Sequence, residues 1–321
     1  MKFKPIDRRL LQNLLGWPLL LLPLLAVGAE LRVVASIKPV HSLVASVMQG
    51  VGEPLLLVQG GASPHEYSLR PSDARAINEA QVVFWIGPDL ENFLVKPLNN
   101  AKGKGQAVAL LAAPGIMVLP LREGGAWEPH QHSHDAHTEP HVDHDRAASR
   151  DAHIWLDPLN AVAMVRQITT MLSAVDPAHK TNYERNSAAL LERLTELNEQ
   201  LALKLEPVKN QPYIVFHDAY QYFERRYNLN GVGSIVLNPE QRPGARRVAE
   251  VQVRIRDLGV RCVFSEPQFQ PALVETVIAG SSVRRGVLDP EGGAELPAGP
   301  DAYFQLVQNL ADALRSCLNG I

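Results

Sequence analysis

The chain is poor in cysteine, in net charge and in basic runs, and the last two shortages argue against a nucleic-acid-binding protein. Its 321 residues include only two cysteines and carry a formal net charge of −3. No stretch of Lys and Arg is interleaved with aromatic residues, so we expect no nucleic-acid partner. Beyond the N-terminus no apolar run is long enough to cross a membrane. With 46% hydrophobic and 20% charged residues, the composition is that of a globular chain of about two domains.

Motifs of common enzymes are absent as well. The sequence contains no HExxH helix, no GxSxG nucleophile turn and no glycine loop of the kind that cradles phosphate. We therefore predict that the protein is not an enzyme.

Residues 1–29 have the pattern of a bacterial secretory signal. A leader with four Lys or Arg residues precedes an apolar stretch from Leu14 to Val27, and small residues follow at Gly28 and Ala29. A transmembrane anchor is the alternative, although the stretch is shorter than the ~20 residues needed to span a bilayer and contains two prolines. The pair Arg8-Arg9 matches a twin-arginine signal only weakly, so ordinary export is favoured.

The two cysteines, Cys262 and Cys317, both lie in the last third of the chain. An isolated pair in an oxidising compartment usually forms a disulfide. Such a bond would close a loop of about 55 residues and stabilise the fold by about 4 kcal/mol on the chain-entropy model. Two buried free thiols are the alternative.

Residues 158–208 are predicted to form two helices that connect the halves of the chain. Asp157-Pro158 and Asp176-Pro177 are both helix starts, with a capping Asp before a Pro at the first helical position. Between Ala178 and Glu206 there is no Gly or Pro, and leucines recur at three- and four-residue steps. A helix of that length reaches ~43 Å, the diameter of a domain. This pattern predicts a long rigid connection.

Both flanks of these helices alternate short apolar runs with helical patterns, which predicts an α/β fold. We expect two β/α lobes, residues 30–157 and 209–321, each with a four-stranded, mainly parallel sheet and flanking helices. Val82 to Ile86 is apolar without alternation, as is typical of a strand buried on both faces of a parallel sheet. The similar size of the two lobes suggests a cleft between them.

Residues 123–151 interrupt the first lobe with a segment rich in Gly, His and Asp that has no periodicity. We predict a disordered surface loop. Because neutral imidazoles on a flexible chain bind zinc, copper or nickel transiently, auxiliary metal binding is favoured over a merely polar spacer. The loop holds six of the eleven histidines of the chain: His130, His132, His134, His137, His141 and His144.

Metal-competent side chains also occur where predicted strands end, which is where open α/β sheets bind ligands. His65 follows a strand of the first lobe, His153 precedes the central helices, and His217 and Asp289 each close a strand of the second lobe. Three imidazoles and one carboxylate form a tetrahedral set that suits zinc, with too few oxygens for calcium or magnesium.

Several neighbouring residues admit two interpretations. Asp157, Asp218 and Glu66 are close enough in sequence to accept hydrogen bonds from ligand histidines. Asp157 is explained at least as well as a helix cap. His41 and His179 are interpreted as surface histidines.

Six motifs together resemble a known family over nearly the whole chain after residue 29. That family comprises the zinc-binding periplasmic proteins of ABC importers, the ZnuA-like members of the cluster A-I (cluster 9) substrate-binding proteins. The motifs are Ser36-Ile37-Lys38-Pro39, Pro64 to Asp73 (PHEYSLRPSD), His153 to Pro158 (HIWLDP), Phe216 to Tyr220 (FHDAY), Phe264 to Phe269 (FSEPQF) and Leu288-Asp289-Pro290.

The resemblance implies a fold of two β/α lobes joined by a rigid helix, with zinc in the cleft between the lobes. It implies that His65, His153 and His217 are zinc ligands. Asp289 matches the C-terminal carboxylate of the family and is the candidate fourth ligand, with a water as the alternative. Manganese-type relatives usually carry Glu at the place of His217, so this residue favours zinc.

The function implied is that of a periplasmic, high-affinity zinc-binding component that catalyses no reaction. It captures Zn²⁺ and delivers it to an inner-membrane ABC permease. We expect a monomer, with periplasmic zinc chaperones as further candidate partners. A manganese or iron receptor of the same family is the nearest alternative. More distant ones are a metal chaperone or adhesin on the same fold, and a zinc hydrolase with Glu66 or Glu266 as its base.

Overall fold

The computed structural model describes residue 1 and residues 31–59, 61–101, 105–122, 127, 150–236, 239 and 243–320. The predicted export signal after Met1 and the six loop histidines lie outside these residues. Within the described part of the chain, no helix combines the length and the apolar character that a membrane span requires.

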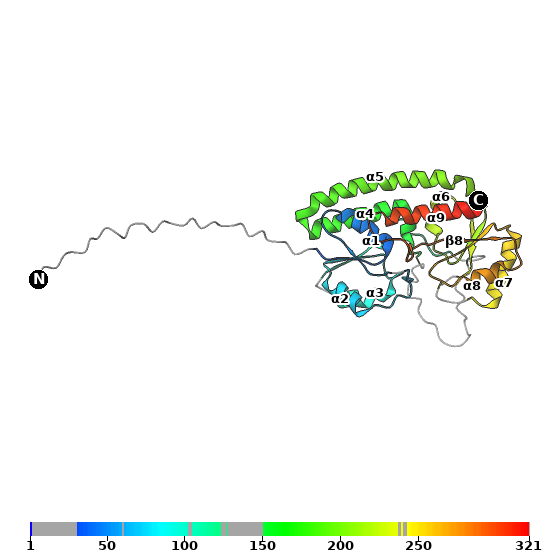
Figure 1. Cartoon of the computed structure of the whole chain (residues 1–321), viewed down its shortest axis with the longest axis horizontal. Helices are drawn as coiled ribbons and strands as arrows, with labels where there is room; N and C mark the ends of the chain where they lie inside the picture. The colour runs from blue at the N-terminus through cyan, green and yellow to red at the C-terminus, as the bar shows by residue number, and fades with distance from the viewer. Residues whose placement is uncertain are drawn as a thin grey trace, which may run out of the picture. The chain divides into compact units, whose positions relative to one another are not determined.

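The first lobe contains a parallel four-stranded sheet in the order β2-β1-β3-β4. Every residue of β3 is buried, as its unbroken apolar sequence predicts. Figure 1 shows α1 on one side of this sheet and the pair α2 and α3 on the other. The elements are β1 (Val33–Ala35), α1 (Lys38–Met48), β2 (Leu55–Leu56), α2 (Pro71–Glu79), β3 (Val82–Trp85), α3 (Asn92–Asn100) and β4 (Gln106–Ala109).

The second lobe repeats this connectivity in a second parallel sheet, ordered β6-β5-β7-β8. The prediction of two four-stranded sheets with flanking helices is therefore confirmed. The elements are β5 (Tyr213–Val215), α6 (Gln221–Tyr227), β6 (Gly231–Ser234), α7 (Ala245–Asp257), β7 (Cys262–Ser265), α8 (Ala272–Ile278), β8 (Arg284–Val287) and α9 (Ala302–Asn319).

The central helices are α4 (Pro158–Val175) and α5 (Lys180–Leu205), joined by the short helix η3 (Pro177–His179). Asp157 caps α4 by accepting a hydrogen bond from the amide of Leu159 at 2.9 Å. The two helices, expected in series, fold back and pack on each other, and α5 is the one that extends over both lobes (Figure 1). With 26 residues, α5 is ~39 Å long.

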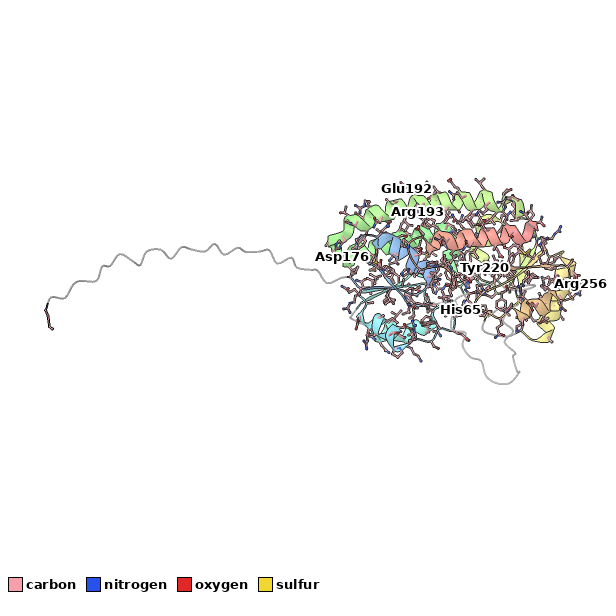
Figure 2. The ribbon with its side chains drawn as sticks, in the orientation of Figure 1. His65, Asp176, Glu192, Arg193, Tyr220 and Arg256 are labelled. Atoms are coloured by element: carbon pink, nitrogen blue, oxygen red, sulfur yellow. A yellow bond between two sulfur atoms is a disulfide. The ribbon has the colours of Figure 1, made fainter. Side chains whose placement is uncertain are left out.

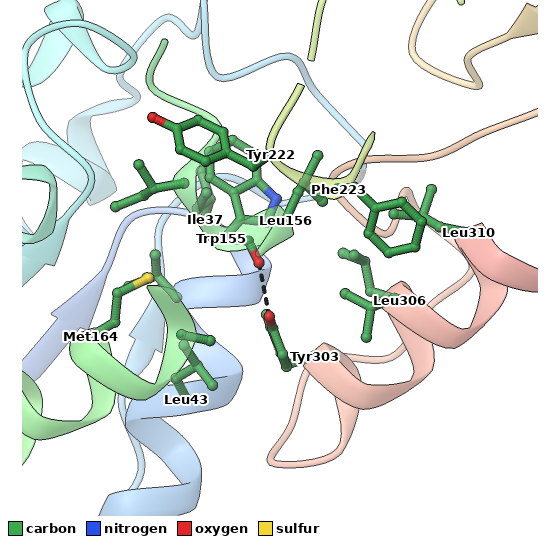
Figure 3. Packing of buried hydrophobic residues seen from close by; sticks show 14 of the residues in the cluster. Ile37, Leu43, Trp155, Leu156, Met164, Tyr222, Phe223, Tyr303, Leu306 and Leu310 are labelled. Atoms are coloured by element: carbon green, nitrogen blue, oxygen red, sulfur yellow. Dashed lines mark hydrogen bonds between the residues drawn. The ribbon is translucent and has the colours of Figure 1, made fainter. Parts of the chain in front are cut away.

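One hydrophobic core runs through both lobes beneath these helices. Trp155, which precedes α4, is fully buried, and its indole N–H donates to the carbonyl of Pro290 in the second lobe at 2.8 Å. Tyr303 of α9 donates its hydroxyl hydrogen to the carbonyl of Trp155, also at 2.8 Å (Figure 3). Ile37 from the first lobe and Leu306 from α9 lie in the same cluster (Figure 3). Because the lobes share this packed core, they do not form two independently hinged bodies.

A disulfide joins Cys262 in β7 to Cys317 in α9 across 55 residues. Both sulfurs are thus bonded, and neither is available as a metal ligand. The bond ties the C-terminal helix, which packs on α1 and α5, to the second sheet.

Glu91, just before α3, is a fully buried carboxylate. It accepts hydrogen bonds from the hydroxyl of Ser36 (2.5 Å) and from the amides of Ile86 (3.2 Å) and Gly87 (2.9 Å). Burial nevertheless raises the pKa of Glu91 to about 7. A folded-state pKa above the unfolded value of ~4.3 means that the protonated form stabilises the fold. This stabilisation is complete below about pH 4 and is lost as the pH rises through 7.

We therefore expect Glu91→Gln, which cannot ionise, to remove this pH dependence. The free energy of unfolding of the metal-free wild type, minus that of the variant, should fall by about 2 to 3 kcal/mol between pH 5 and pH 8. Denaturant titration at each pH measures this difference. Glu184→Gln, at an exposed position on α5, should show no such fall. Parallel profiles for Glu91→Gln and the wild type would contradict the prediction.

Candidate metal centre

His65 lies in the irregular segment between β2 and α2, on the first-lobe side of the centre. Its backbone amide donates to the hydroxyl of Ser63 at 3.3 Å. Among the described residues, no group forms a hydrogen bond with its ring. Figure 2 shows His65 in the middle of the folded part, where the first lobe faces the second. Burial, followed by the proximity of His153 and His217, lowers the pKa of His65 to about 2, so this imidazole is neutral at physiological pH.

His153 directly precedes the short helix η2 (Ile154–Leu156), and it is held by a carboxylate two residues earlier. The Nδ1 atom of its ring lies 2.8 Å from Oδ1 of Asp151, and its backbone amide donates to the same oxygen at 3.0 Å. Asp151 is buried and also lies beside Leu119, to whose carbonyl its amide donates at 2.9 Å. The predicted disordered loop ended at Asp151. The structure shows that Asp151 is instead an ordered residue that orients His153.

His217 follows β5 and is held in the same way by Glu266, which follows β7. Its Nδ1 lies 2.7 and 2.8 Å from the two carboxylate oxygens of Glu266. Tyr220 donates its hydroxyl hydrogen to the same carboxylate at 3.2 Å. Burial lowers the pKa of His217, but the carboxylate of Glu266 outweighs this effect, so the pKa lies above its ordinary value.

The three rings meet in one group. Their potential ligand nitrogens all lie within 4.8 Å of one another, and the ring centroids are 5.4 to 5.8 Å apart. The Nε2 atoms of His153 and His217 are buried, and neither has a hydrogen-bond partner among the described residues. Since each Nδ1 faces a carboxylate, we assign the proton to Nδ1 and the free lone pair to Nε2.

This is the tautomer that binds a metal ion, with a carboxylate behind the imidazole. A tetrahedral zinc ion with Zn–N bonds of ~2.0–2.1 Å holds its nitrogens about 3.4 Å apart. Small movements of the three rings bring them to that spacing. The donor set and its orphaned nitrogens therefore fit a zinc ion.

Asp289 is not a member of this group of three. Its Oδ1 accepts hydrogen bonds from Nε2 of Gln268 (2.7 Å) and from the amides of Glu291 (3.1 Å) and Gly292 (2.9 Å). The other carboxylate oxygen has none of these donors. Asp289 or a water as fourth ligand remains a prediction.

The other candidate carboxylates have different partners. Asp157 forms an ion pair with Arg226 in addition to capping α4, and Asp218 forms one with Arg122. Glu66 is exposed. In the described structure, none of them has a hydrogen bond to a site imidazole. Asp151 and Glu266 are the carboxylates that contact the imidazoles there.

The prediction that two further histidines lie on the surface is wrong for His41 and confirmed for His179. His41 is buried in α1, and its Nε2 lies 3.0 Å from the carbonyl of Pro54, so its interpretation as a surface residue was wrong. Ten of the eleven residues of α1 are buried, so this helix has no exposed face on which His41 could lie. His179 is exposed and pairs with Asp176 at 2.7 Å, as a surface histidine does.

Sequence reasoning missed Asp151 and named Glu266 only as the base of a hydrolase. A signal existed for each. Asp151 stands two residues before His153, within the reach of a local turn. Glu266 follows β7, which pairs in parallel with β5, so it ends at the same sheet edge as His217.

Comparison with known proteins shows which family the chain belongs to. The family model described as "ZnuA: Zinc-uptake complex component A periplasmic" matches residues 33–317. A high-affinity zinc uptake system protein ZnuA of Brucella suis is 49% identical over 311 residues, covering 91% of this chain and 93% of its own. The ZnuA of Yersinia pestis is 34% identical, covering 90% and 92%. A crystal structure of ZnuA superposes with a TM-score of 0.71 at 25% identity, covering 89% of this chain and 99% of that one. The chain therefore belongs to the ZnuA family of periplasmic zinc-uptake components.

Proposed function

We propose that this protein is the zinc receptor of an ABC importer, which captures Zn²⁺ in the periplasm and delivers it to an inner-membrane permease. The observation that carries the proposal is the group of three imidazoles, His65, His153 and His217, whose nitrogens converge from both lobes. Under this proposal they are the zinc ligands, and Asp289 or a water completes the shell. The protein acts as a monomer, and periplasmic zinc chaperones are candidate donors or acceptors of the ion.

The same proposal assigns the parts of the chain. Residues 1–29 serve as the export signal, residues 30–157 and 209–321 as the two lobes, and residues 158–208 as the helical connection. The segment 123–151 serves as an accessory loop whose six histidines gather zinc near the cleft. The cleft between the lobes holds the tight site.

Zinc is favoured over manganese and iron by the chemistry of the donors. Three imidazoles form a nitrogen-rich site of intermediate softness, whereas manganese prefers carboxylate, carbonyl and water oxygens. The two carboxylates closest to the rings, those of Asp151 and Glu266, face Nδ1 atoms and support the imidazoles.

A receptor is also favoured over a hydrolase. The candidate base Glu266 is buried, and its carboxylate is engaged by His217 and Tyr220. A base must be within reach of a metal-bound water. Glu266 instead lies behind the ring, on the side opposite to Nε2.

The decisive test is native mass spectrometry with competitive metal titration on residues 30–321 and on a variant lacking residues 124–150. We expect the loopless protein to retain one tightly bound zinc that excess manganese does not displace, while the total zinc bound per molecule decreases. The full-length chain after residue 29 is the control. If the loopless protein holds no metal, or prefers manganese, the ligand assignment is contradicted and the histidine loop becomes the main zinc-binding segment.

The carboxylate behind His217 gives a separate prediction. Glu266→Gln preserves the shape of the side chain but removes the negative charge facing Nδ1, so the imidazole becomes a poorer ligand. We expect zinc affinity to fall about 10–100-fold, measured by competition with a chelator of known affinity. Glu275→Gln, an exposed Glu on α8, should bind zinc like the wild type. Unchanged affinity in Glu266→Gln would show that this contact does not tune the metal site.

A further inference from the structure

Lys38, the first residue of α1, is a buried cation that reaches across to the second lobe. The residue is only 8% exposed. The ammonium donates to the carbonyl of Gly292 at 2.7 Å, to that of Leu296 at 2.6 Å, and to that of Gly293. Lys has three N–H donors and no acceptor, so all of its hydrogen-bonding capacity is used on this one segment.

The segment Asp289–Leu296 is shaped to receive this cation. The amides of Glu291 and Gly292 donate to Oδ1 of Asp289, which forms a tight turn. Gly292 and Gly293 have φ values of +81° and +35°, in the left-handed region that favours glycine. A Cβ added at Gly292 would lie 2.7 Å from Cδ2 of Leu296 and 3.3 Å from Cδ of Lys38. The glycines therefore let the carbonyls face Lys38 at close range.

The same segment lies against the stretch of the first lobe that leads to His65. A Cβ added at Gly61 would be 3.1 Å from the amide nitrogen of Ala294 and 3.4 Å from the backbone of Gly293. His65 is the least buried of the three site histidines, and its ring has no hydrogen bond in the described structure. Its position thus depends on packing around residues 61–65, part of which the segment Asp289–Leu296 provides.

We propose that Lys38 is a positioning residue of the metal site, which holds the segment Asp289–Leu296 against the first lobe and thereby slows the escape of zinc. The inference rests on the proposed function. Without the ammonium, three carbonyl groups lose their donor, and unpaired buried carbonyls are costly enough to move the segment toward water. That movement loosens the cover beside His65 and releases the turn that orients Asp289. The histidines themselves remain in place, so the effect falls on the release of the ion and much less on its capture.

The test compares Lys38→Met with Lys180→Met, a matched control at an exposed position of α5. We expect release of zinc into excess chelator, followed by stopped flow, to be about 10–100-fold faster in Lys38→Met, with the association rate within about threefold of the wild type. Amide hydrogen exchange in the metal-free proteins should be faster at Glu291 and Gly292 in Lys38→Met and unchanged in β5 and α5, which report the intact fold. Gly292→Ala perturbs the same contact from the other side and should also speed release.

In the double variant, the effects of Lys38→Met and Gly292→Ala on the rate of zinc release should be less than additive, because both substitutions disrupt the same contact. Wild-type release rates and exchange in Lys38→Met would overturn the proposal, as would faster release with unchanged exchange of the segment. If the wild type binds no zinc tightly, the proposed function fails and the role of Lys38 in release fails with it. The exchange of the metal-free segment then still decides whether Lys38 holds it in place.

Discussion

His217→Ala is expected to weaken tight zinc binding severely. The variant removes a buried imidazole whose Nε2, within the described part of the chain, has no partner other than the ion we propose. It also leaves the buried carboxylate of Glu266 without the ring that it faces. Since losing a carboxylate behind a ligand costs about 10–100-fold in affinity, losing the ligand should cost at least about 100-fold. Competition with a chelator of known affinity, on protein lacking residues 124–150, measures the loss.

The control for this substitution is His179→Ala. His179 is an exposed histidine at the end of η3, outside the site, and its ring pairs with Asp176. We expect this variant to bind zinc as the wild type does. Retention of a tight zinc ion by His217→Ala would show that the ion is held elsewhere, and the three-histidine site would have to be abandoned.

Removing the disulfide has the second-largest expected effect, and it acts on stability. The double variant Cys262→Ala, Cys317→Ala frees a loop of 55 residues in the unfolded chain. The chain-entropy model predicts a loss of about 4 kcal/mol. At an unfolding entropy of about 2.1 cal/mol/K per residue, this loss lowers the Tm by roughly 7 °C. Calorimetry on the metal-free protein measures the shift without the stabilisation that bound zinc would add.

Reduced wild-type protein is the matched control for the double variant, and the two should unfold at similar temperatures. Zinc affinity should be retained in both, because neither sulfur belongs to the histidine group. A Tm shift below about 2 °C would mean that the denatured chain does not gain the freedom that the model assumes. Loss of the zinc site instead would show that the bond positions the second sheet for metal binding.

The shared core has a consequence for how metal is released. Trp155 and Tyr303 are fully buried and join residues before α4 to α9, while α5 extends over both lobes (Figures 1 and 3). Opening the lobes widely would expose this core to water, at a large cost in hydrophobic free energy. Release through local movement of segments such as Asp289–Leu296 avoids that cost.

Local patterns in the sequence were enough to predict the architecture. The start of α4 follows from Asp157-Pro158, because the side chain of Asp157 accepts a hydrogen bond from the amide two positions further along the chain. The buried strand β3 follows from its unbroken apolar run, and the disulfide follows from having only two cysteines in an exported chain. Each of these signals depends on neighbours along the chain or on composition, which a sequence displays directly.

The histidines were found because parallel strands bring their carboxyl ends to one edge, so a list of polar residues after strands already contained His65 and His217. Their supports were not found in this way. Glu266 faces His217 only because β7 pairs with β5, and Lys38 faces Gly292 only because two lobes close around one core. Strand order and lobe packing arise from contacts between residues that are far apart in sequence. They decide which buried groups find partners, and that is why only the tertiary structure revealed the contacts of Glu266 and Lys38.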